Sequence, residues 1–344
     1  MTDDIILMAD GGGGERMRAF IAREILSRFA PGDASGELAR LGDAARVEAG
    51  GTLAFTTDGY VVQPLEFPGG DIGRLAISGT VNDLACLGGR PVAIALALIL
   101  EEGLEVATLR RVLDSAAATA REAGVAVVCG DTKVVERRGA GGLFITTSGI
   151  GVLAPDRRLG PEAVRPGDRV LVSGTVGDHG VAVMSRREGL RFEAAVASDV
   201  APLWSLAARL LAACPNLRCL KDPTRGGLAA ALNEIAEAAG LRMRIEEAAV
   251  PVRPAVAGAC ETLGLDPLTV ANEGKFVVLV PPDEAEAALG AMRGHPLGHE
   301  AAAIGEVLEA PRKGSFGPLV ALRTQIGGER VLEMPYGEDL PRIC

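Results

Sequence analysis

Three aspartates sit beside small or polar residues where helices or strands are expected to end. They are Asp58, which precedes a glycine, Asp83, which follows Asn82, and Asp131, which lies two residues before Lys133. Carboxylates from separate elements that meet at one end of a sheet commonly hold Mg²⁺ on a nucleotide, because magnesium takes oxygen ligands and bridges to phosphate oxygens. Lys133 would neutralise charge on the same phosphates. Capping and turn formation are the alternative, and for one aspartate alone they are the more common role.

Two clusters in the second half of the sequence add further candidate groups. Arg225-Gly226-Gly227 places glycines at the entry of an expected helix, which is a natural anion-binding position. Glu273 stands at the start of an expected buried strand, where desolvation would raise its pKa and make it a usable general base. His179 is a second candidate base, although a turn histidine without an evident partner more often faces solvent.

A glycine run and a thiol stand near the two ends of the sequence. Gly11, Gly12, Gly13 and Gly14 would let backbone N–H groups approach a phosphate, but the run lacks the Lys-Ser/Thr of a Walker loop and the spacing of a dinucleotide fingerprint. By itself such a run is more often a flexible turn. Cys344, the last residue, follows a polar and turn-rich segment. A thiol on a mobile tail can be carried into a second site and modified there; the alternative is an incidental thiol on a frayed end.

Bulk composition disfavours several classes of protein. The net charge is −10 and no Lys/Arg cluster stands out among 344 residues, so neither a nucleic-acid surface nor a polybasic membrane contact is expected. The longest apolar run, Pro91 to Leu100, is too short to span a bilayer, and the first residues lack the basic region of a signal peptide. The six cysteines are scattered and are expected to be free thiols in a reducing compartment. These features predict a cytoplasmic protein.

The alternation of expected helices and strands predicts an α+β fold. The expected strands at 125–135 and 143–152 are close enough in sequence to pair antiparallel, which favours a mixed sheet covered by helices on one face over a doubly wound parallel sheet. Helices are expected at about 15–29, 71–87, 106–123, 202–213, 228–239, 254–263 and 283–292. The predicted parts are a Gly-rich segment at 1–40, an N-terminal domain at 41–155, a C-terminal α/β domain at 156–326 and a mobile tail at 327–344.

Six motifs, taken together, resemble those of a known family. They are Gly79-Thr-Val-Asn-Asp-Leu84, Gly130-Asp-Thr-Lys133, Gly177-Asp-His-Gly180, Asp222-Pro-Thr-Arg-Gly-Gly-Leu228, Ala271-Asn-Glu-Gly-Lys275 and the final Pro-Arg-Ile-Cys344. In this order, over nearly the whole sequence, they resemble the HypE family of hydrogenase expression/formation proteins, within the aminoimidazole-ribonucleotide-synthetase-like ATP-binding superfamily. The Pro-Arg-Ile-Cys end is specific to HypE within that superfamily. The resemblance implies two mixed-sheet α+β domains and a flexible C-terminal tail.

The resemblance also implies an activity, which is the ATP-dependent dehydration that makes the cyanide ligand of NiFe hydrogenase. In that family HypF delivers a carbamoyl group to the sulfur that matches Cys344, loss of water leaves a thiocyanate, and the cyano group passes to iron on the HypC–HypD complex. The matching proton-handling pair is Lys133 and Glu273. The matching Mg²⁺–ATP residues are Asp58, Asp83 and Asp131, and the nucleotide-binding residues implied are Gly11, Gly12, Gly13, Gly14, Asn82, Asp222, Arg225 and Asn272.

Dimerisation through the N-terminal sheets is implied by the resemblance alone. Other enzymes of the superfamily are the main rivals. A selenophosphate synthetase would need a cysteine or selenocysteine near the N-terminal glycines, whereas the first cysteine here is Cys86. Thiamine-monophosphate kinase and the purine cyclo-ligase have no use for a terminal thiol. A non-catalytic carrier that only displays Cys344 stays open as an alternative, and ATP hydrolysis stimulated by carbamoylation would exclude it.

Overall fold

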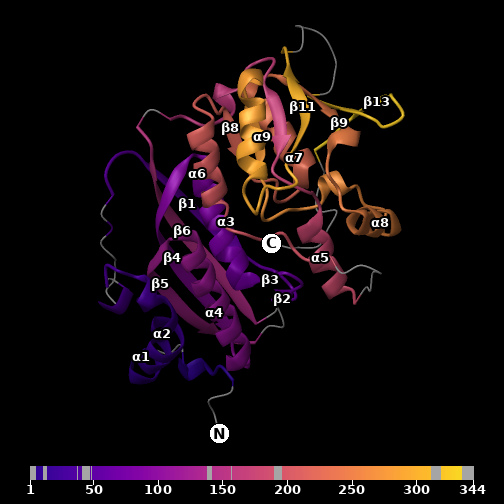
Figure 1. The fold of residues 1–344 in the computed structure, drawn as a ribbon. Helices are drawn as coiled ribbons and strands as arrows, with labels where there is room; N and C mark the ends of the chain where they lie inside the picture. The colour runs from indigo at the N-terminus through magenta and orange to yellow at the C-terminus, as the bar shows by residue number, and fades with distance from the viewer. Residues whose placement is uncertain are drawn as a thin grey trace.

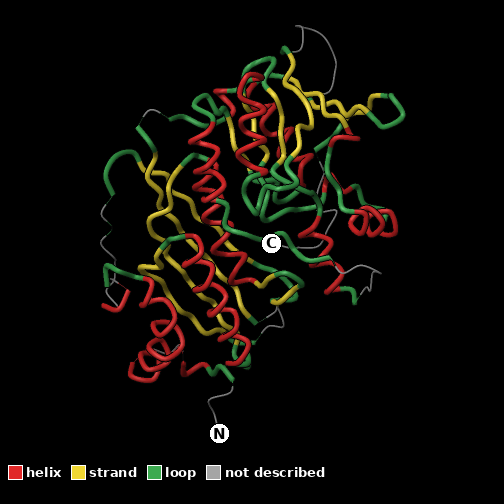
Figure 2. Tube along the Cα trace, viewed as in Figure 1, coloured by secondary structure: helices red, strands yellow, loops and turns green. Residues whose placement is uncertain are grey.

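The computed structural model describes residues 5–10, 14–36, 38–40, 47, 49–137, 142–155, 157–189, 196–310 and 319–334. Two sheets, each with its own helices, lie one beyond the other along the molecule, as Figure 1 shows by chain position and Figure 2 by the two groups of yellow strands. Helices α3 (Ile72–Cys86) and α6 (Trp204–Ala213) are in contact where the two parts meet. None of the helices described here is long and apolar enough to cross a membrane.

The first sheet has the strand order β1-β6-β4-β5. Its strands are β1 (Leu53–Tyr60), β4 (Gly89–Glu101), β5 (Ala126–Val135) and β6 (Leu143–Leu153). β6 pairs antiparallel with both β1 and β4, whereas β5 pairs parallel with β4. The predicted direct pairing of 125–135 with 143–152 is therefore wrong. Helix α4 (Val106–Ala123) returns the chain to a parallel position beside β4, so β4 separates the two strands.

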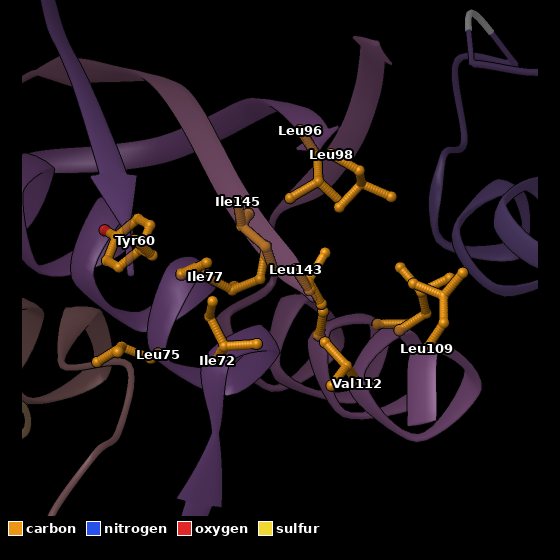
Figure 3. Close-up of a cluster of buried hydrophobic side chains, with 14 of the residues drawn as sticks. Tyr60, Ile72, Leu75, Ile77, Leu96, Leu98, Leu109, Val112, Leu143 and Ile145 are labelled. Atoms are coloured by element: carbon orange, nitrogen blue, oxygen red, sulfur yellow. The ribbon is translucent and has the colours of Figure 1, made fainter. Parts of the chain in front are cut away.

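Helices α3 and α4 pack against one face of this sheet. The carboxylate of Asp71 caps the start of α3 by accepting hydrogen bonds from the backbone N–H groups of Gly73 and Arg74. Helix α4 ends at Gly124, which takes a left-handed φ of 66°. Apolar side chains between the helices and the sheet form the core of this domain. Figure 3 shows part of it, with labels on Tyr60, Ile72, Leu75, Ile77, Leu96, Leu98, Leu109, Val112, Leu143 and Ile145.

The helical stretch expected at about 15–29 is present ahead of the sheet. It consists of α1 (Gly14–Ile21), a π-helical turn (Ala22–Leu26) and α2 (Ser27–Phe29). Phe20 and Phe29 are buried in the same core as α4.

The other face of the first sheet carries exposed apolar side chains. Because side chains alternate along a strand, Leu53 and Phe55 of β1 point away from the helices, as does Ile99 of β4. Their exposed fractions are 46%, 68% and 39%. Large exposed apolar side chains gathered on one face indicate an interaction surface. We refer to this surface as the open face.

The second sheet has the order β13-β12-β9-β11-β7-β10-β8. Its strands are β7 (Arg169–Val172), β8 (Cys219–Lys221), β9 (Arg242–Glu246), β10 (Val277–Val280), β11 (Ala302–Leu308), β12 (Val320–Arg323) and β13 (Glu329–Val331). Helix α7 (Gly227–Ala239) packs in one core cluster, and α6 and α9 (Ala285–Arg293) pack in another. Helices α5 (Asp178–Arg187) and α8 (Pro254–Leu263) pack together in a smaller cluster. Unlike the first sheet, this one is covered by helices on both faces.

The tail predicted at 327–344 begins inside the second sheet. A turn closed by a hydrogen bond from Thr324 N to Gly328 O leads into β13, which pairs antiparallel with β12. Leu332 is 1% exposed and belongs to the domain core. Strand β13 spans three residues, too few for an alternating pattern to mark it in the sequence. Residues 335–344, with Cys344, lie outside the described part of the chain.

Candidate functional site

A cavity of about 240 Å³ lies where the two domains meet. Its walls come from β1 and α3 of the first domain, and from the loop after β8 and the segment before β10 of the second. The residues that line it are Thr57, Asp58, Gly59, Tyr60, Gly79, Asp83, Lys221, Asp222, Thr224, Arg225 and Glu273. The structure therefore brings together five residues singled out in the sequence: Asp58, Asp83, Asp222, Arg225 and Glu273.

Asp58 and Asp83 come from two elements that pack against each other, β1 and α3. Asp58 lies near the end of β1 and shares one face of that strand with Thr56, because side chains two residues apart point the same way. Asp83 lies in the last turn of α3. The Thr56 hydroxyl donates a hydrogen bond to Asp83 Oδ2 at 2.7 Å. The strand thus orients the carboxylate that the helix presents to the cavity.

Tyr60 and Gly79 form the adjoining wall of the cavity. A Cβ atom at Gly79 would lie 2.4 Å from the Tyr60 hydroxyl oxygen, so only glycine lets the buried ring approach α3 this closely. Thr80 Oγ1 lies 3.5 Å from the Tyr60 hydroxyl and 2.5 Å from Thr147 Oγ1. Gly79 therefore allows Tyr60 to pack against α3 and form this wall of the cavity.

Two consecutive glycines start helix α7 at the cavity. Gly226 and Gly227 take φ values of 73° and 60°, in the left-handed region that favours glycine. A Cβ at Gly227 would lie 2.5 Å from the carbonyl oxygen of Val270 and 2.7 Å from that of Leu268. Arg225 stands on the turn just before them and is exposed. Arg225 thus lines the cavity and α7 begins two residues later, and both a guanidinium and a helix N-terminus favour a bound anion.

Burial in this cavity raises the pKa of several carboxyl groups. Burial, with smaller contributions from the charges of Asp222 and Asp58, raises the pKa of Asp83 to about 6. Burial and then the charge of Asp222 raise the pKa of Glu273 well above its ordinary value. Burial also raises the pKa of Asp222. Carboxylates that repel one another in a poorly hydrated space are stabilised by a bound cation.

The donor set of the cavity fits Mg²⁺ that arrives with a nucleotide. Over the residues that the structure describes, no three Asp, Glu, His or Cys side chains converge closely enough to hold a bare metal ion. Magnesium does not require such a cage, because it keeps several waters and is bound by one or two carboxylates plus phosphate oxygens. Asp58, Asp83 and Asp222 offer carboxylate oxygens of that kind beside the anion-binding turn at Arg225.

Comparison with known proteins decides the family. The sequence matches "AIR synthase related protein, N-terminal domain" over residues 41–153 and "AIR synthase related protein, C-terminal domain" over residues 165–317. It is 51% identical to the carbamoyl dehydratase HypE of Rhodobacter capsulatus over 344 residues, which is 100% of this chain and 99% of that protein. This chain belongs to the HypE family.

Solved HypE structures share the fold. A crystal structure of the hydrogenase maturation protein HypE in complex with ATP has a TM-score of 0.93 at 45% identity, covering 98% of this chain and 99% of that one. The HypE chain in a crystal structure of a HypE–HypF complex has a TM-score of 0.79 at 42% identity, covering 94% of this chain and 100% of that one. The two mixed-sheet domains implied by the resemblance are confirmed.

The two asparagines expected to bind nucleotide instead hold loops together. Asn82 Nδ2 donates to the carbonyl oxygens of Ala201 and Glu273, at 3.1 and 3.3 Å, and its Oδ1 accepts from Leu203 N at 2.7 Å. Asn82 is 1% exposed. It therefore ties α3 of the first domain to the backbone of Glu273 in the second.

Asn272, which directly precedes Glu273, also holds loops together through its side-chain amide. It is fully buried, its Oδ1 accepts from Gly177 N at 2.7 Å, and its Nδ2 donates to the carbonyl oxygens of Pro223 and Val270. Both N–H donors of its side chain are used in this way. Neither asparagine lines the cavity.

Asp131 and Lys133 do not join the cavity of their own chain. The strand pairing places four residues in one row across the first sheet: Gly59, Thr146, Ala97 and Asp131. Asp131 therefore lies in the row next to Asp58. It lies, however, on β5, at the opposite edge from β1, and its side chain points to the open face while Asp58 points to the helices. Lys133 Nζ lies 3.2 Å from Asp131 Oδ2, and both side chains are exposed, at 64% and 57%.

The remaining sequence candidates fall into two groups. Gly14 starts α1, whereas Gly11, Gly12, Gly13 and Cys344 lie outside the described residues. His179 was expected to face solvent, and this prediction is wrong. It is fully buried on α5, with its Nδ1 2.8 Å from Ser198 Oγ and its ring edge-on to Phe67. Packing of α5 against the β2–β3 ribbon (Glu66–Phe67, Gly70–Asp71) removes this histidine from water.

Several residues that line the cavity or support its walls carried no clear signal in the sequence. Tyr60 and Thr56 belong to an ordinary-looking strand, and Asp199 stands in no recognisable motif. Lys221 is one of only four lysines in the sequence and directly precedes Asp222. That scarcity was the one available hint, because arginine provides most of the positive charge elsewhere. Lys221 Nζ lies 2.8 Å from Glu234 Oε2 at the edge of the cavity.

Proposed function

We propose that this chain is an ATP-dependent carbamoyl dehydratase of hydrogenase maturation, which converts a thiocarboxamide on Cys344 into a thiocyanate. The product would supply the cyanide ligand of the NiFe hydrogenase iron centre. One observation carries the proposal: a single cavity combines carboxylates suited to Mg²⁺–nucleotide, an anion-binding helix start and a buried glutamate suited to act as a base.

The chemistry explains why a nucleotide is needed. An amide cannot lose oxide, but it can lose phosphate once its oxygen has been phosphorylated. In the first step the carbamoyl oxygen attacks the γ-phosphorus of ATP, an N–H proton is withdrawn and ADP leaves. In the second step the C–O bond breaks, phosphate departs, the remaining N–H proton is released and a C≡N bond forms. The sum converts ATP and the thiocarboxamide into ADP, phosphate, a proton and the thiocyanate.

Each group of the cavity has a part in this scheme. Asp58 and Asp83, with Asp222 nearby, would hold Mg²⁺ on the phosphates, where the ion neutralises charge when bound. The Arg225 guanidinium and the N-terminus of α7 would hold phosphate oxygens. Glu273, whose pKa is raised by burial, would accept the N–H proton, since a carboxylate with a raised pKa is a stronger base.

The location of Lys133 and Asp131 is accounted for by a homodimer. Thr57 and Gly59 line the cavity and belong to the open-face side of β1, so the cavity borders that face. The face carries exposed apolar side chains as well as Asp131 and Lys133. If a second copy packed its open face against this one, its Lys133 and Asp131 would lie beside β1 of the first copy. We therefore assign these two residues to the phosphate site of the partner copy.

Two partners follow from this function. HypF would deliver the carbamoyl group to Cys344, as its complex with a family member suggests. The HypC–HypD complex would accept the cyano group. Cys344 must then visit the cavity, the donor and the acceptor in turn. An extended chain from residue 334 to Cys344 reaches about 30 Å, at about 3.3 Å per residue, which permits such movement.

The test is the mass of the peptide that carries Cys344. The protein is incubated with HypF, carbamoyl phosphate and MgATP, and the peptide is weighed over time. A gain of one carbamoyl group followed by loss of water supports the proposal. Cys344→Ala should take up no carbamoyl group, whereas Cys260→Ala, which removes a buried thiol in α8, should behave as wild type. A carbamoyl group on another cysteine, or one that never loses water, would contradict it.

A further inference from the structure

The loop at 196–203 runs between the two domains and contacts both. On the side of the first domain, the backbone N–H of Ser198 donates to Pro68 O at 2.7 Å, and Arg74 Nε donates to Val200 O at 2.9 Å. We call this segment the connecting loop. Its hydrogen bonds fix it to α3 and to the β2–β3 ribbon, which belong to the same domain as Asp58 and Asp83.

Asp199 attaches the connecting loop to the segment that carries Glu273. Its Oδ1 accepts from Glu273 N at 3.0 Å and its Oδ2 from Gly274 N at 3.2 Å. A Cβ at Gly274 would lie 1.8 Å from Asp199 O, so the glycine permits this approach. Lys275 Nζ lies 3.2 Å from Asp199 Oδ2, and the side chains of Lys275 and Asp199 are only 11% and 4% exposed. One buried carboxylate thus binds two successive backbone N–H groups and an ammonium.

We propose that Asp199 is a positioning residue that fixes the Glu273 carboxylate at the correct distance from the nucleotide site. It does so through the backbone, since its side chain lines a different cavity, together with Lys275 and Arg253. The inference rests on the proposed role of Glu273 as base. Its physical basis is that charge-assisted hydrogen bonds hold geometry well, and that a displacement of about 1 Å at a reacting group can cost roughly 100-fold in rate.

A simpler explanation is that Asp199 only neutralises Lys275. A double variant separates the two roles. Asp199→Asn removes the acceptor for Gly274 N and leaves a buried ammonium without its counterion. Asp199→Asn/Lys275→Met removes that ammonium as well, so it repairs the charge but not the lost hydrogen bond from Gly274 N.

A matched control exists in the same domain. Asp168 is 2% exposed, accepts from Arg165 N at 2.7 Å and lies 3.6 Å from Arg218 Nε, so it too is a buried carboxylate that joins a backbone N–H to a cation. It directly precedes β7 and does not line the cavity of Glu273. Asp168→Asn therefore reports the cost of neutralising such a carboxylate without moving Glu273.

The experiment measures two quantities on the full-length protein: the ATP dissociation constant, and the single-turnover rate of water loss from carbamoylated Cys344. We expect Asp199→Asn to lower the rate by about 10- to 100-fold with less than about a threefold change in ATP affinity. The double variant should remain as slow, and Asp168→Asn should dehydrate at the wild-type rate. Asp199→Glu keeps the charge beside Lys275 but lengthens the side chain by one methylene, so it should also be slow even if the asparagine variant fails to fold.

Three results would overturn the inference. They are a wild-type rate in Asp199→Asn or Asp199→Glu, recovery of the rate in the double variant, and a loss of ATP binding equal to the loss of rate. Glu273→Gln is measured in parallel. If it dehydrates normally, the proposed base is wrong; if it is inactive while the Asp199 variants are fully active, only the inference about Asp199 fails.

Discussion

Asp83 allows a prediction in which stability and function change in opposite directions. The ordinary pKa of its carboxyl group is 3.8, and the cavity raises it to about 6. The folded protein therefore binds this proton more tightly than the unfolded chain. The stability gained from the proton is full below pH 3.8 and is lost as the pH rises through about 6. At about 1.4 kcal/mol per pH unit, the ionised group lowers the free energy of unfolding by about 3 kcal/mol at neutral pH.

Asp83→Asn removes that destabilisation, because asparagine carries no charge and still offers an oxygen to the Thr56 hydroxyl. We expect the nucleotide-free variant to be more stable than wild type by about 2–3 kcal/mol near pH 8, with the difference shrinking as the pH falls toward about 4. The assay is urea denaturation followed by circular dichroism at a series of pH values. The same variant should lose Mg²⁺-dependent ATP binding, measured by calorimetry, since one of the proposed ligands is gone.

The control is Asp114→Asn, which changes an exposed carboxylate on α4 that is paired with Arg28. It should shift the free energy of unfolding by no more than about 1 kcal/mol, because an exposed ion pair contributes little to stability. Lower stability of Asp83→Asn than of wild type near pH 8 would show that the ionised Asp83 does not destabilise the fold. Normal MgATP binding by the variant would show that Asp83 is not a required Mg²⁺ ligand.

Three further predictions concern the glycines at the start of α7 and the proposed homodimer. Gly227→Ala should lose about 2–4 kcal/mol of stability in urea denaturation, from the left-handed backbone plus the clash with Val270, whereas Gly240→Ala, which has a similar φ but open space, should lose only about 1. Phe55→Asp should yield monomers in sedimentation analysis, while Ile326→Asp, which changes an even more exposed side chain, should stay dimeric. Lys133→Met and Asp58→Asn should each be inactive, but mixing them should restore roughly a quarter of the activity, because about half of the dimers are then mixed and each mixed dimer holds one complete site of two. No recovery after subunit exchange would argue against a shared site.

The sequence allowed Asp58 and Asp83 to be anticipated because each lies near the end of a regular element beside small residues, whereas Asp222 was anticipated only through the family resemblance. The sequence also predicted that Asp131 would meet these groups, but in the structure it lies at the opposite edge of the first sheet. It could not show which face Asp131 occupies. That depends on strand order and on the parity of pairing, and a change of one residue in register moves a side chain to the other face. The insertion of β4 between β5 and β6 is a long-range feature of the same kind.

Motif membership was a weaker guide to the role of a residue. Asn82 and Asn272 stand inside motifs, yet their side chains are occupied in joining loops, and the sequence does not distinguish an amide that binds a ligand from one that binds backbone. Asp199 lies outside every motif, and its contact with Glu273 joins residues 74 positions apart. Such contacts depend on the packing of segments far apart in the sequence rather than on local pattern.

The central claim is that Glu273 withdraws the proton that allows the carbamoyl group on Cys344 to lose water. The most direct measurement compares wild type with Glu273→Gln, both carbamoylated at Cys344, by following the peptide mass after MgATP is added. We predict that Glu273→Gln binds ATP with unchanged affinity and loses water about 10²- to 10⁴-fold more slowly. Water loss at the wild-type rate in Glu273→Gln would contradict the account.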